Sequence, residues 1–400
     1  SFIREPSSIS LPSPASVWGG LRSIDPLPEI IKCPVVPVNN ALTSQAITGK
    51  RCVCGCDKPQ FGSCAMISDE RTLEGMLSEP GESTCRVLAE TKGDFLVLGA
   101  GGKMGPTLAM MLRKAAPGRK VLAVSRYSDR DVKARIEDRG IETIEADLLD
   151  ESIYADLPDA PNVFFLAGMK FGATGNQPLT WAMNVYVPAL VARRYARSRI
   201  VALSTGNVYP FTDTGATGSR ETDVPSPVGE YAQSCLGRER MFQYFSQIHG
   251  TAVTLIRLNY ANEPRYGILV DLTSRILRDQ PIDVTMGFVN VIWQGDANNY
   301  IARSLSIAAS PPAILNVAGP EVIRVRDLAE RIGRRLSKEP RLVSREAETA
   351  LLSDSSSCIE QFGPPATSLD EMIERIVDWV AAGRTVLNKP TKYDVRDGKF

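Results

Sequence analysis

The clearest pattern in the sequence is a series of short, almost wholly apolar runs that alternate with longer amphipathic segments. Apolar runs of this length are typical of strands that are buried on both faces of a sheet. They span residues 94–98, 120–125, 162–167, 199–204 and 251–257, with a shorter run that ends at Ala146. The segments between them predict helices over residues 107–115, 130–139, 177–198 and 229–247. This alternation predicts an α/β fold, a Rossmann-type doubly wound parallel sheet.

The two ends of the chain lack this alternation. Residues 1–65 are rich in proline and serine without periodicity, so we expect a disordered or loosely attached leader there. Residues 66–92 have the pattern of a helical lead-in. Beyond residue 257 the alternation becomes irregular and rich in turns, which predicts that 258–400 form mainly a smaller second domain.

The charge balance excludes several classes of protein. The chain has 46 basic and 46 acidic side chains, and nucleic-acid or anionic-membrane binders would show a basic excess instead. No apolar run approaches the ~18 residues of a membrane-spanning helix, so we expect no membrane partner. The single histidine, His249, excludes multi-histidine metal sites, and we expect no metal site.

The cysteines are unevenly distributed between residues 1–65 and the rest of the chain. Beyond residue 65 there are only Cys85, Cys235 and Cys358, which is typical of a reduced, cytoplasmic protein. The cluster from Cys52 to Cys64 lacks the spacing of common zinc sites, so we expect an unstructured tail rather than a metal centre.

A glycine-rich loop follows the first predicted strand directly and opens a helix. Gly99 permits a tight turn, Gly102 lets a ligand approach the backbone, and Gly105 allows the helix to pack closely on the sheet. The helix N-terminus adds an anion site. The context of strand, loop and helix therefore predicts a dinucleotide site that includes the loop residues Lys103 and Met104.

The end of the second strand bears on the choice of dinucleotide. NAD-selective folds place an acidic residue there, against the ribose 2′-hydroxyl. This chain has Ser125 and Arg126 instead, and a hydroxyl and a guanidinium suit a 2′-phosphate. The sequence therefore favours NADP(H) over NAD(H).

The spacing Gly-x-x-Gly-x-x-Gly resembles that of the short-chain dehydrogenase/reductase superfamily. Residues 204–210, STGNVYP, resemble a segment of its extended branch, the NAD-dependent epimerase/dehydratase family, and Tyr231 follows Thr205 at the family's spacing of 26 residues. The resemblance covers most of residues 93–385.

The resemblance implies a function for each part of the chain. Residues 93–257 would form the NAD(P)-binding Rossmann domain, and 258–400 mainly the substrate-binding domain. It places further dinucleotide contacts at Asp147 and Leu148 beside the adenine, and at Ala167, Tyr231 and Cys235. By family position, polar substrate contacts would come from Asn207, Asn259 and Gln294. Family members often form homodimers.

The resemblance also implies the chemistry. Thr205 would steady a substrate oxygen while the phenolate of Tyr231 removes a proton and hydride passes to the nicotinamide. The family places a lysine four residues after the tyrosine, where it favours the phenolate and holds the nicotinamide ribose. Here that position is Cys235, and a thiol offers no positive charge.

Three interpretations of this departure are open. The site has lost its redox chemistry, or another cation substitutes, or Cys235 is itself reactive. We favour substitution by Lys170, which lies just past the fourth strand at the edge where parallel sheets bind ligands. Arg238 and Arg240 are expected on a solvated helix face.

The sequence therefore predicts an NAD(P)-dependent epimerase/dehydratase-like oxidoreductase or isomerase that acts on a sugar or nucleotide-sugar. One alternative is a non-catalytic dinucleotide-binding sensor or scaffold protein. The other is a simple NADPH-dependent carbonyl reductase.

Overall fold

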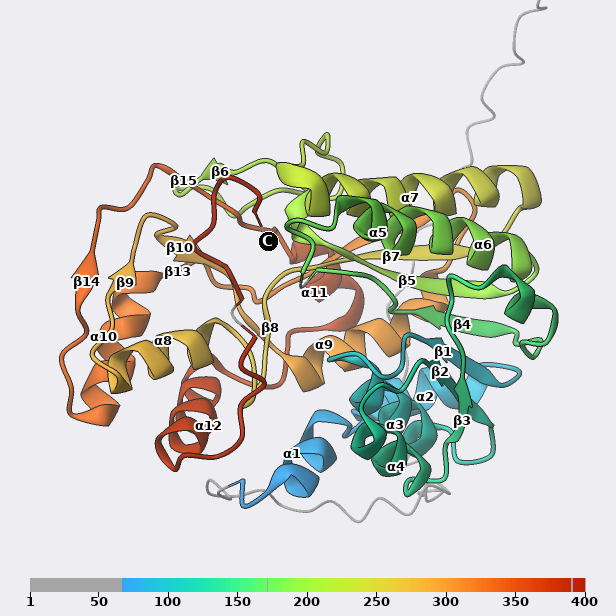
Figure 1. Cartoon of the computed structure of the whole chain (residues 1–400), viewed down its shortest axis with the longest axis horizontal. Helices are drawn as coiled ribbons and strands as arrows, with labels where there is room; N and C mark the ends of the chain where they lie inside the picture. The colour runs from blue at the N-terminus through green and yellow to red at the C-terminus, as the bar shows by residue number, and fades with distance from the viewer. Residues whose placement is uncertain (1–66, 171, 390, 400) are drawn as a thin grey trace, which may run out of the picture. The chain divides into compact units, whose positions relative to one another are not determined.

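A computed structural model describes residues 67–170, 172–389 and 391–399 (Figure 1). The expectations for residues 1–65, including the cysteine cluster, lie outside the described residues. No helix in the part that is described is long and apolar enough to cross a membrane.

The core of the protein is a seven-stranded sheet in which all neighbouring strands are parallel. Its order is β12-β7-β5-β4-β1-β2-β3. The strands are β1 (Phe95–Leu98), β2 (Val121–Ser125), β3 (Glu142–Glu145), β4 (Asn162–Phe165), β5 (Arg199–Thr205), β7 (Val253–Leu258) and β12 (Ala313–Val317). The predicted fold class is confirmed, and the seventh strand comes from beyond residue 257.

Helices cover both faces of this sheet, because successive residues of each buried strand point to opposite sides. In β1, Phe95 and Val97 pack in a cluster with α3 (Gly105–Ala115) and α9 (Gln294–Arg303), whereas Leu96 and Leu98 pack with the helices of the other face. Figure 1 shows the latter group, α5, α6 and α7, together along one face. The sheet is thus a double-faced core, as its apolar strands require.

The helix predicted over residues 177–198 is interrupted. It consists of α5 (Gln177–Trp181), a π-helical turn η2 (Ala182–Tyr186) and α6 (Val187–Arg194). The next helix on this face, α7 (Gly229–His249), is continuous and ends at Gly250, which has a left-handed backbone with φ of 71°. Asn184 in the π-helical turn is fully buried against α7 and donates to the hydroxyl of Ser234.

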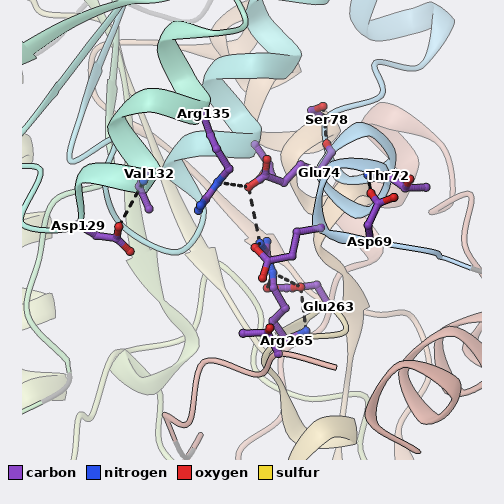
Figure 2. A network of polar contacts seen from close by, with 12 residues as sticks. Asp69, Thr72, Glu74, Ser78, Asp129, Val132, Arg135, Glu263 and Arg265 are labelled. Carbon is purple, nitrogen blue, oxygen red and sulfur yellow. Dashed lines mark hydrogen bonds and ion pairs between the residues drawn. The ribbon is translucent and has the colours of Figure 1, made fainter. Parts of the chain in front are cut away.

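The helical lead-in consists of two helices, α1 (Glu70–Leu77) and α2 (Glu82–Glu90), instead of one. The buried carboxylate of Glu74 in α1 accepts from Arg135 of α4 (Arg130–Glu137) at 3.1 Å. It also lies 3.6 Å from Arg265, which pairs with Glu263 (Figure 2). Helix α1 therefore connects the first half of the sheet to the segment that follows β8 (Ala261–Asn262).

The remaining helices form a second apolar core. Leu272 of α8 (Ile268–Leu277), Leu328 of α10 (Val325–Leu336) and Ile376 of α12 (Leu369–Ala381) belong to one buried cluster. The other short elements are η1 (Glu151–Ala155), η3 (Gly206–Val208), β6 (Thr212–Asp213), β9 (Ile282–Asp283), β10 (Phe288–Val289), β11 (Ile292–Trp293), η4 (Ser304–Ile307), β13 (Ile323–Arg324), β14 (Leu342–Val343), β15 (Thr349–Ala350) and α11 (Ser356–Phe362).

Candidate active site

A cavity of about 240 Å³ lies at the carboxyl ends of β1, β4 and β5. The order of the central strands reverses between β1 and β4, and open α/β sheets bind ligands at such a point. The cavity wall includes the glycine loop, the ends of β4 and β5, the start of α7 and the segment around β8. The cavity therefore joins the dinucleotide loop to the irregular second half of the chain.

The glycine loop has the geometry that a dinucleotide diphosphate requires. Gly99 has φ of +88°, and a Cβ there would lie 2.5 Å from the backbone nitrogen of Ala167. A Cβ on Gly105 would lie 2.6 Å from the Cα of Ala100, so α3 packs directly on the turn. On Gly102 a Cβ would meet only the oxygen of Gly99, at 3.3 Å, so this glycine leaves open the surface where a ligand would approach. The residues present fit the group that the motif predicts.

Two substitutions in this loop will separate folding from binding. Gly105→Ala will lower the melting temperature because its Cβ collides with the backbone of Ala100. Gly102→Ala will leave the melting temperature nearly unchanged and weaken dinucleotide binding at least ~10-fold, since its methyl group occupies the ligand side. Thermal unfolding and dinucleotide titration measure the two effects. Equal losses of stability in both variants would contradict this assignment.

The residues predicted to select the dinucleotide lie at the ends of β2 and β3, beside the glycine loop. A Cβ on Gly101 would lie 2.6 Å from the hydroxyl of Ser125, which shows how closely the loop approaches β2. Arg126 forms an exposed ion pair with Asp147, with 3.9 Å between nitrogen and oxygen. Leu148, the neighbour of Asp147, is buried. An arginine and an acidic residue thus meet where the ribose of a bound dinucleotide is expected.

Thr205 and Tyr231, the predicted catalytic pair, come together in the cavity. Thr205 ends β5, and Tyr231 lies in the first turn of α7. The hydroxyl of Tyr231 hydrogen-bonds with Thr205 and with Cys235. Burial raises the pKa of Tyr231 well above its usual value, and the nearby Cys235 raises it further, whereas Arg238 and the bond with Thr205 lower it.

Cys235 is fully buried one helical turn after Tyr231. Burial raises the pKa of its thiol, whereas Arg238 and the hydrogen bond with Tyr231 lower this pKa in part. A neutral thiol in this position supplies no charge to the tyrosine.

Lys170 lies beside Tyr231, as the substitution hypothesis requires. Its Nζ is 5.8 Å from the centroid of the tyrosine ring and donates to the carbonyl oxygen of Thr391 at 3.3 Å. Burial lowers the pKa of Lys170 to about 8, although Cys235 and Asp271 oppose the shift. The loop after β4 and the C-terminal segment together hold this cation in the cavity.

Arg238 is not on a solvated face, and this prediction was wrong. Its guanidinium is buried between α7 and the ends of β4 and β5, where it donates to the oxygen of Leu203 at 2.6 Å and to Asn184 Oδ1 at 2.7 Å. It also lines the cavity. The missing side chain of Gly168 provides the space, because a Cβ there would lie 3.2 Å from Arg238 Cζ. Arg240 is exposed, as expected.

The predicted substrate contacts divide into two groups. Asn207 and Asn259 line the cavity. Gln294 does not: it is fully buried in α9, where its Nε2 donates to the hydroxyl of Thr107 at 3.1 Å. It supports the packing of α3 on α9 and lies outside the cavity wall.

The side chain of Lys103 extends from the glycine loop to the segment around β8. Its Nζ donates to the carbonyl oxygen of Ala261 at 2.6 Å and lies 4.0 Å from the centroid of the Tyr266 ring. Its pKa is lowered to about 7, mainly by burial and further by the neighbouring Lys170, whereas Glu263 raises it. No local pattern could reveal a contact between residues 158 positions apart.

The parallel sheet and the glycine loop define a Rossmann-type fold, and Thr205 and Tyr231 meet in the cavity at the carboxyl edge of its sheet. Residues 95–269 match the model of the NAD dependent epimerase/dehydratase family. This match confirms the resemblance that the sequence shows over this region.

Solved structures of nucleotide-sugar enzymes have the same fold. MoeE5 in complex with UDP-glucose and NAD is 21% identical over 73% of this chain and 99% of its own, with a TM-score of 0.61. UDP-glucose 4-epimerase from Thermotoga maritima with UDP-glucose is 18% identical, over 72% and 99%, with a TM-score of 0.61. UDP-glucuronic acid 4-epimerase from Bacillus cereus with UDP-glucuronic acid and NAD is 17% identical, over 72% and 99%, also with a TM-score of 0.61. No curated protein sequence matches the chain closely enough to count as a relative.

Proposed function

We propose that this protein is an NAD(P)-dependent epimerase, dehydratase or reductase that acts on a nucleotide-sugar by hydride transfer. One observation carries the proposal: a single cavity unites the glycine loop, the pair of Thr205 and Tyr231, and the ammonium group of Lys170. Each of these groups has a separate task in such a reaction, and they come from four different parts of the chain.

The residues of the cavity would act as follows. Tyr231 takes the proton of a substrate hydroxyl, and the hydroxyl of Thr205 holds the substrate oxygen through a hydrogen bond. Lys170 stabilises the phenolate by its charge and donates to the hydroxyl groups of a bound ligand. The glycine loop and the N-terminus of α3 hold the dinucleotide diphosphate. When bound, the nicotinamide would supply the acceptor or donor of hydride.

The charge of the cavity supports an anionic ligand. Among the described residues that line it, Lys103, Lys170 and Arg238 are basic and none is acidic. Dinucleotides and nucleotide-sugars both carry a diphosphate, and the similar structures contain UDP-glucose or UDP-glucuronic acid. We therefore propose a nucleotide-sugar substrate in which Asn207 and Asn259 bind hydroxyl groups of the sugar.

For the dinucleotide we propose a preference for NADP(H). Replacing Arg126 with glutamine will weaken NADPH binding at least ~10-fold and change NADH binding less than ~2-fold, because the guanidinium would pair with a phosphate that NADH lacks. Titration of both dinucleotides measures the change in selectivity. Equal effects on both dinucleotides would show that Arg126 does not distinguish them. That result would favour NAD, which the similar structures contain.

We also propose that the boundary between the dinucleotide-binding and substrate-binding domains lies at residue 257. The same proposal includes a homodimer and a cytoplasmic location. The thiols of Cys235 and Cys358 are not in a disulfide among the described residues, which supports a reducing compartment.

Two observations favour the alternative of a non-catalytic dinucleotide-binding protein. Cys235 occupies the position of the expected lysine, and the pKa of Tyr231 is raised rather than lowered. A tyrosine that stays protonated binds ligands without removing protons.

The test combines the purified protein with NAD or NADP and a set of nucleotide-sugars, beginning with UDP-glucose and UDP-glucuronic acid. Product formation is followed by NMR, and the near-ultraviolet absorbance of reduced nicotinamide is recorded at the same time. Sugar conversion that Tyr231→Phe abolishes supports the proposal. Stoichiometric consumption of free NADPH with carbonyl compounds indicates a simple reductase. Dinucleotide binding without either reaction indicates a sensor or scaffold.

A further inference from the structure

Arg238 is a buried cation without a carboxylate partner. It is 6% exposed, and among the described residues no acidic side chain lies within ion-pair distance of it. Glu239, its neighbour, is engaged by Arg257 through both oxygens. Arg238 donates only to the neutral oxygens of Leu203 and Asn184, and its Nε has no hydrogen-bond partner within the described part of the chain.

An unpaired buried charge is costly, because burial removes the water that would otherwise stabilise it. A guanidinium also remains charged, since arginine does not lose its proton in proteins. The fold nevertheless makes room for this group. A Cβ on Gly168 would collide with the guanidinium and lie 2.9 Å from Asn184 Oδ1, so Arg238 occupies space that any side chain at residue 168 would fill. The hydrogen bonds to Leu203 and Asn184 and the contact of Cζ with the Phe165 ring, 5.6 Å from its centroid, hold the guanidinium in place, and its charge remains available to a negative charge that forms nearby.

The groups around Tyr231 identify that negative charge. Tyr231, Cys235 and Arg238 are four and three residues apart on α7 and therefore lie along one face of the helix. From the other elements, Thr205 of β5 and Lys170 after β4 approach the tyrosine. Cys235 and Tyr231 are thus the ionisable groups on the helix face that carries the guanidinium.

We propose that Arg238 is a positioning residue whose buried guanidinium supplies the fixed positive charge for the phenolate of Tyr231. The charge that the family resemblance leads one to expect at residue 235 has moved one turn further along the same helix face. Lys170 then adds its charge from the cavity side, where its ammonium can also donate to a ligand. This inference rests on the proposed function, in which Tyr231 acts as the base. Arg238 lowers the pKa of Tyr231, which agrees with this proposal.

The test measures the ionisation of Tyr231 directly and needs neither substrate nor turnover. A fluorinated tyrosine is incorporated at residue 231, because its lower intrinsic pKa brings ionisation into the range where proteins stay folded, and it is titrated by 19F NMR. Arg238→Met should reduce the ionised fraction at a fixed pH about tenfold, and Arg238→Lys should reduce it less, because a charge remains. Arg240→Met, which removes an exposed arginine of the same helix, is the matched control and should change it less than about twofold.

A rescue variant tests the relocation of the charge. Cys235→Lys in the Arg238→Met background returns an ammonium to the fourth position after Tyr231 and should restore most of the ionised fraction. If Arg238→Met does not fold, Arg238→Lys and Gly168→Ala, which displaces the guanidinium without removing it, provide the comparison with the parent. An unchanged titration of residue 231 in these folded variants overturns the proposal. A clear shift in a protein that converts no sugar overturns the proposed function alone.

Discussion

Replacing Lys170 with alanine will reduce turnover at least ~100-fold while leaving dinucleotide binding measurable, the range that loss of a group supporting proton transfer produces. Nζ of Lys170 lies 5.8 Å from the Tyr231 ring centroid inside the cavity, so its removal takes away a cation that lies beside the ring. The glycine loop, which we propose holds the dinucleotide diphosphate, is untouched by the change. Steady-state kinetics and dinucleotide titration measure the two effects.

The control for this experiment is Lys120→Ala. Lys120 is exposed and precedes β2 at the amino edge of the sheet, opposite the cavity. Its removal should leave turnover and binding within about twofold of the parent, since exposed charges at that range are screened. Turnover that survives the loss of Lys170 would contradict its assigned role and leave Arg238 as the cation that supports Tyr231.

The pH dependence gives the same prediction a second readout. The pKa of Lys170 is lowered to about 8, so its ammonium is charged below that pH and neutral above it. Turnover that depends on this charge should therefore fall as the pH rises through about 8. Lys170→Arg keeps a charge at every accessible pH, and any activity it retains should lack this alkaline fall. A parent profile without the fall would show that the charge of Lys170 does not limit turnover.

Local patterns predicted the sheet well, because burial on both faces requires continuous apolar runs. Residues 94–98 and 162–167 are such runs, and they became β1 and β4 at the centre of the sheet. Thr205 and Tyr231 were identified through the family resemblance and not through such a pattern, and both line the cavity. The helix predicted over 177–198 was less accurate. Periodicity does not register the π-helical turn that places Asn184 against α7.

Side-chain placement failed where contacts join distant parts of the chain. A charged residue on a helix is normally solvated, and nothing local to Arg238 indicated that Gly168 leaves space for its guanidinium. Lys103 reaches Ala261 across the cavity, and Lys170 depends on Thr391, 221 residues away. Gln294 had the residue type of a substrate contact but lies against Thr107 instead. Such outcomes depend on how the two halves of the chain pack, which no single segment records.

The buried ion pair of Glu239 and Arg257 should have the largest effect on stability. Glu239 of α7 accepts from Arg257 of β7 at 3.1 and 2.8 Å and from the hydroxyl of Ser204 at 2.6 Å. The side chains of the ion pair are at most 2% exposed. Replacing Glu239 with alanine leaves the guanidinium buried without its carboxylate, so the free energy of unfolding should fall by about 3–5 kcal/mol. Urea denaturation measures this change through the midpoint at constant slope.

An exposed pair provides the comparison, since Arg335 and Asp378 lie 2.8 Å apart with side chains 38% exposed. Asp378→Ala should lower the free energy of unfolding by less than about 1 kcal/mol. Glu239→Leu combined with Arg257→Met removes both buried charges, and this double variant should recover much of the stability that Glu239→Ala loses. Because Ser204 precedes Thr205 directly, the double variant also asks whether the ion pair aligns the end of β5. Full stability of the double variant with reduced turnover would show that the ion pair aligns the end of β5. Equal loss of stability in Glu239→Ala and in the double variant would contradict the prediction that the unpaired buried charge causes the loss.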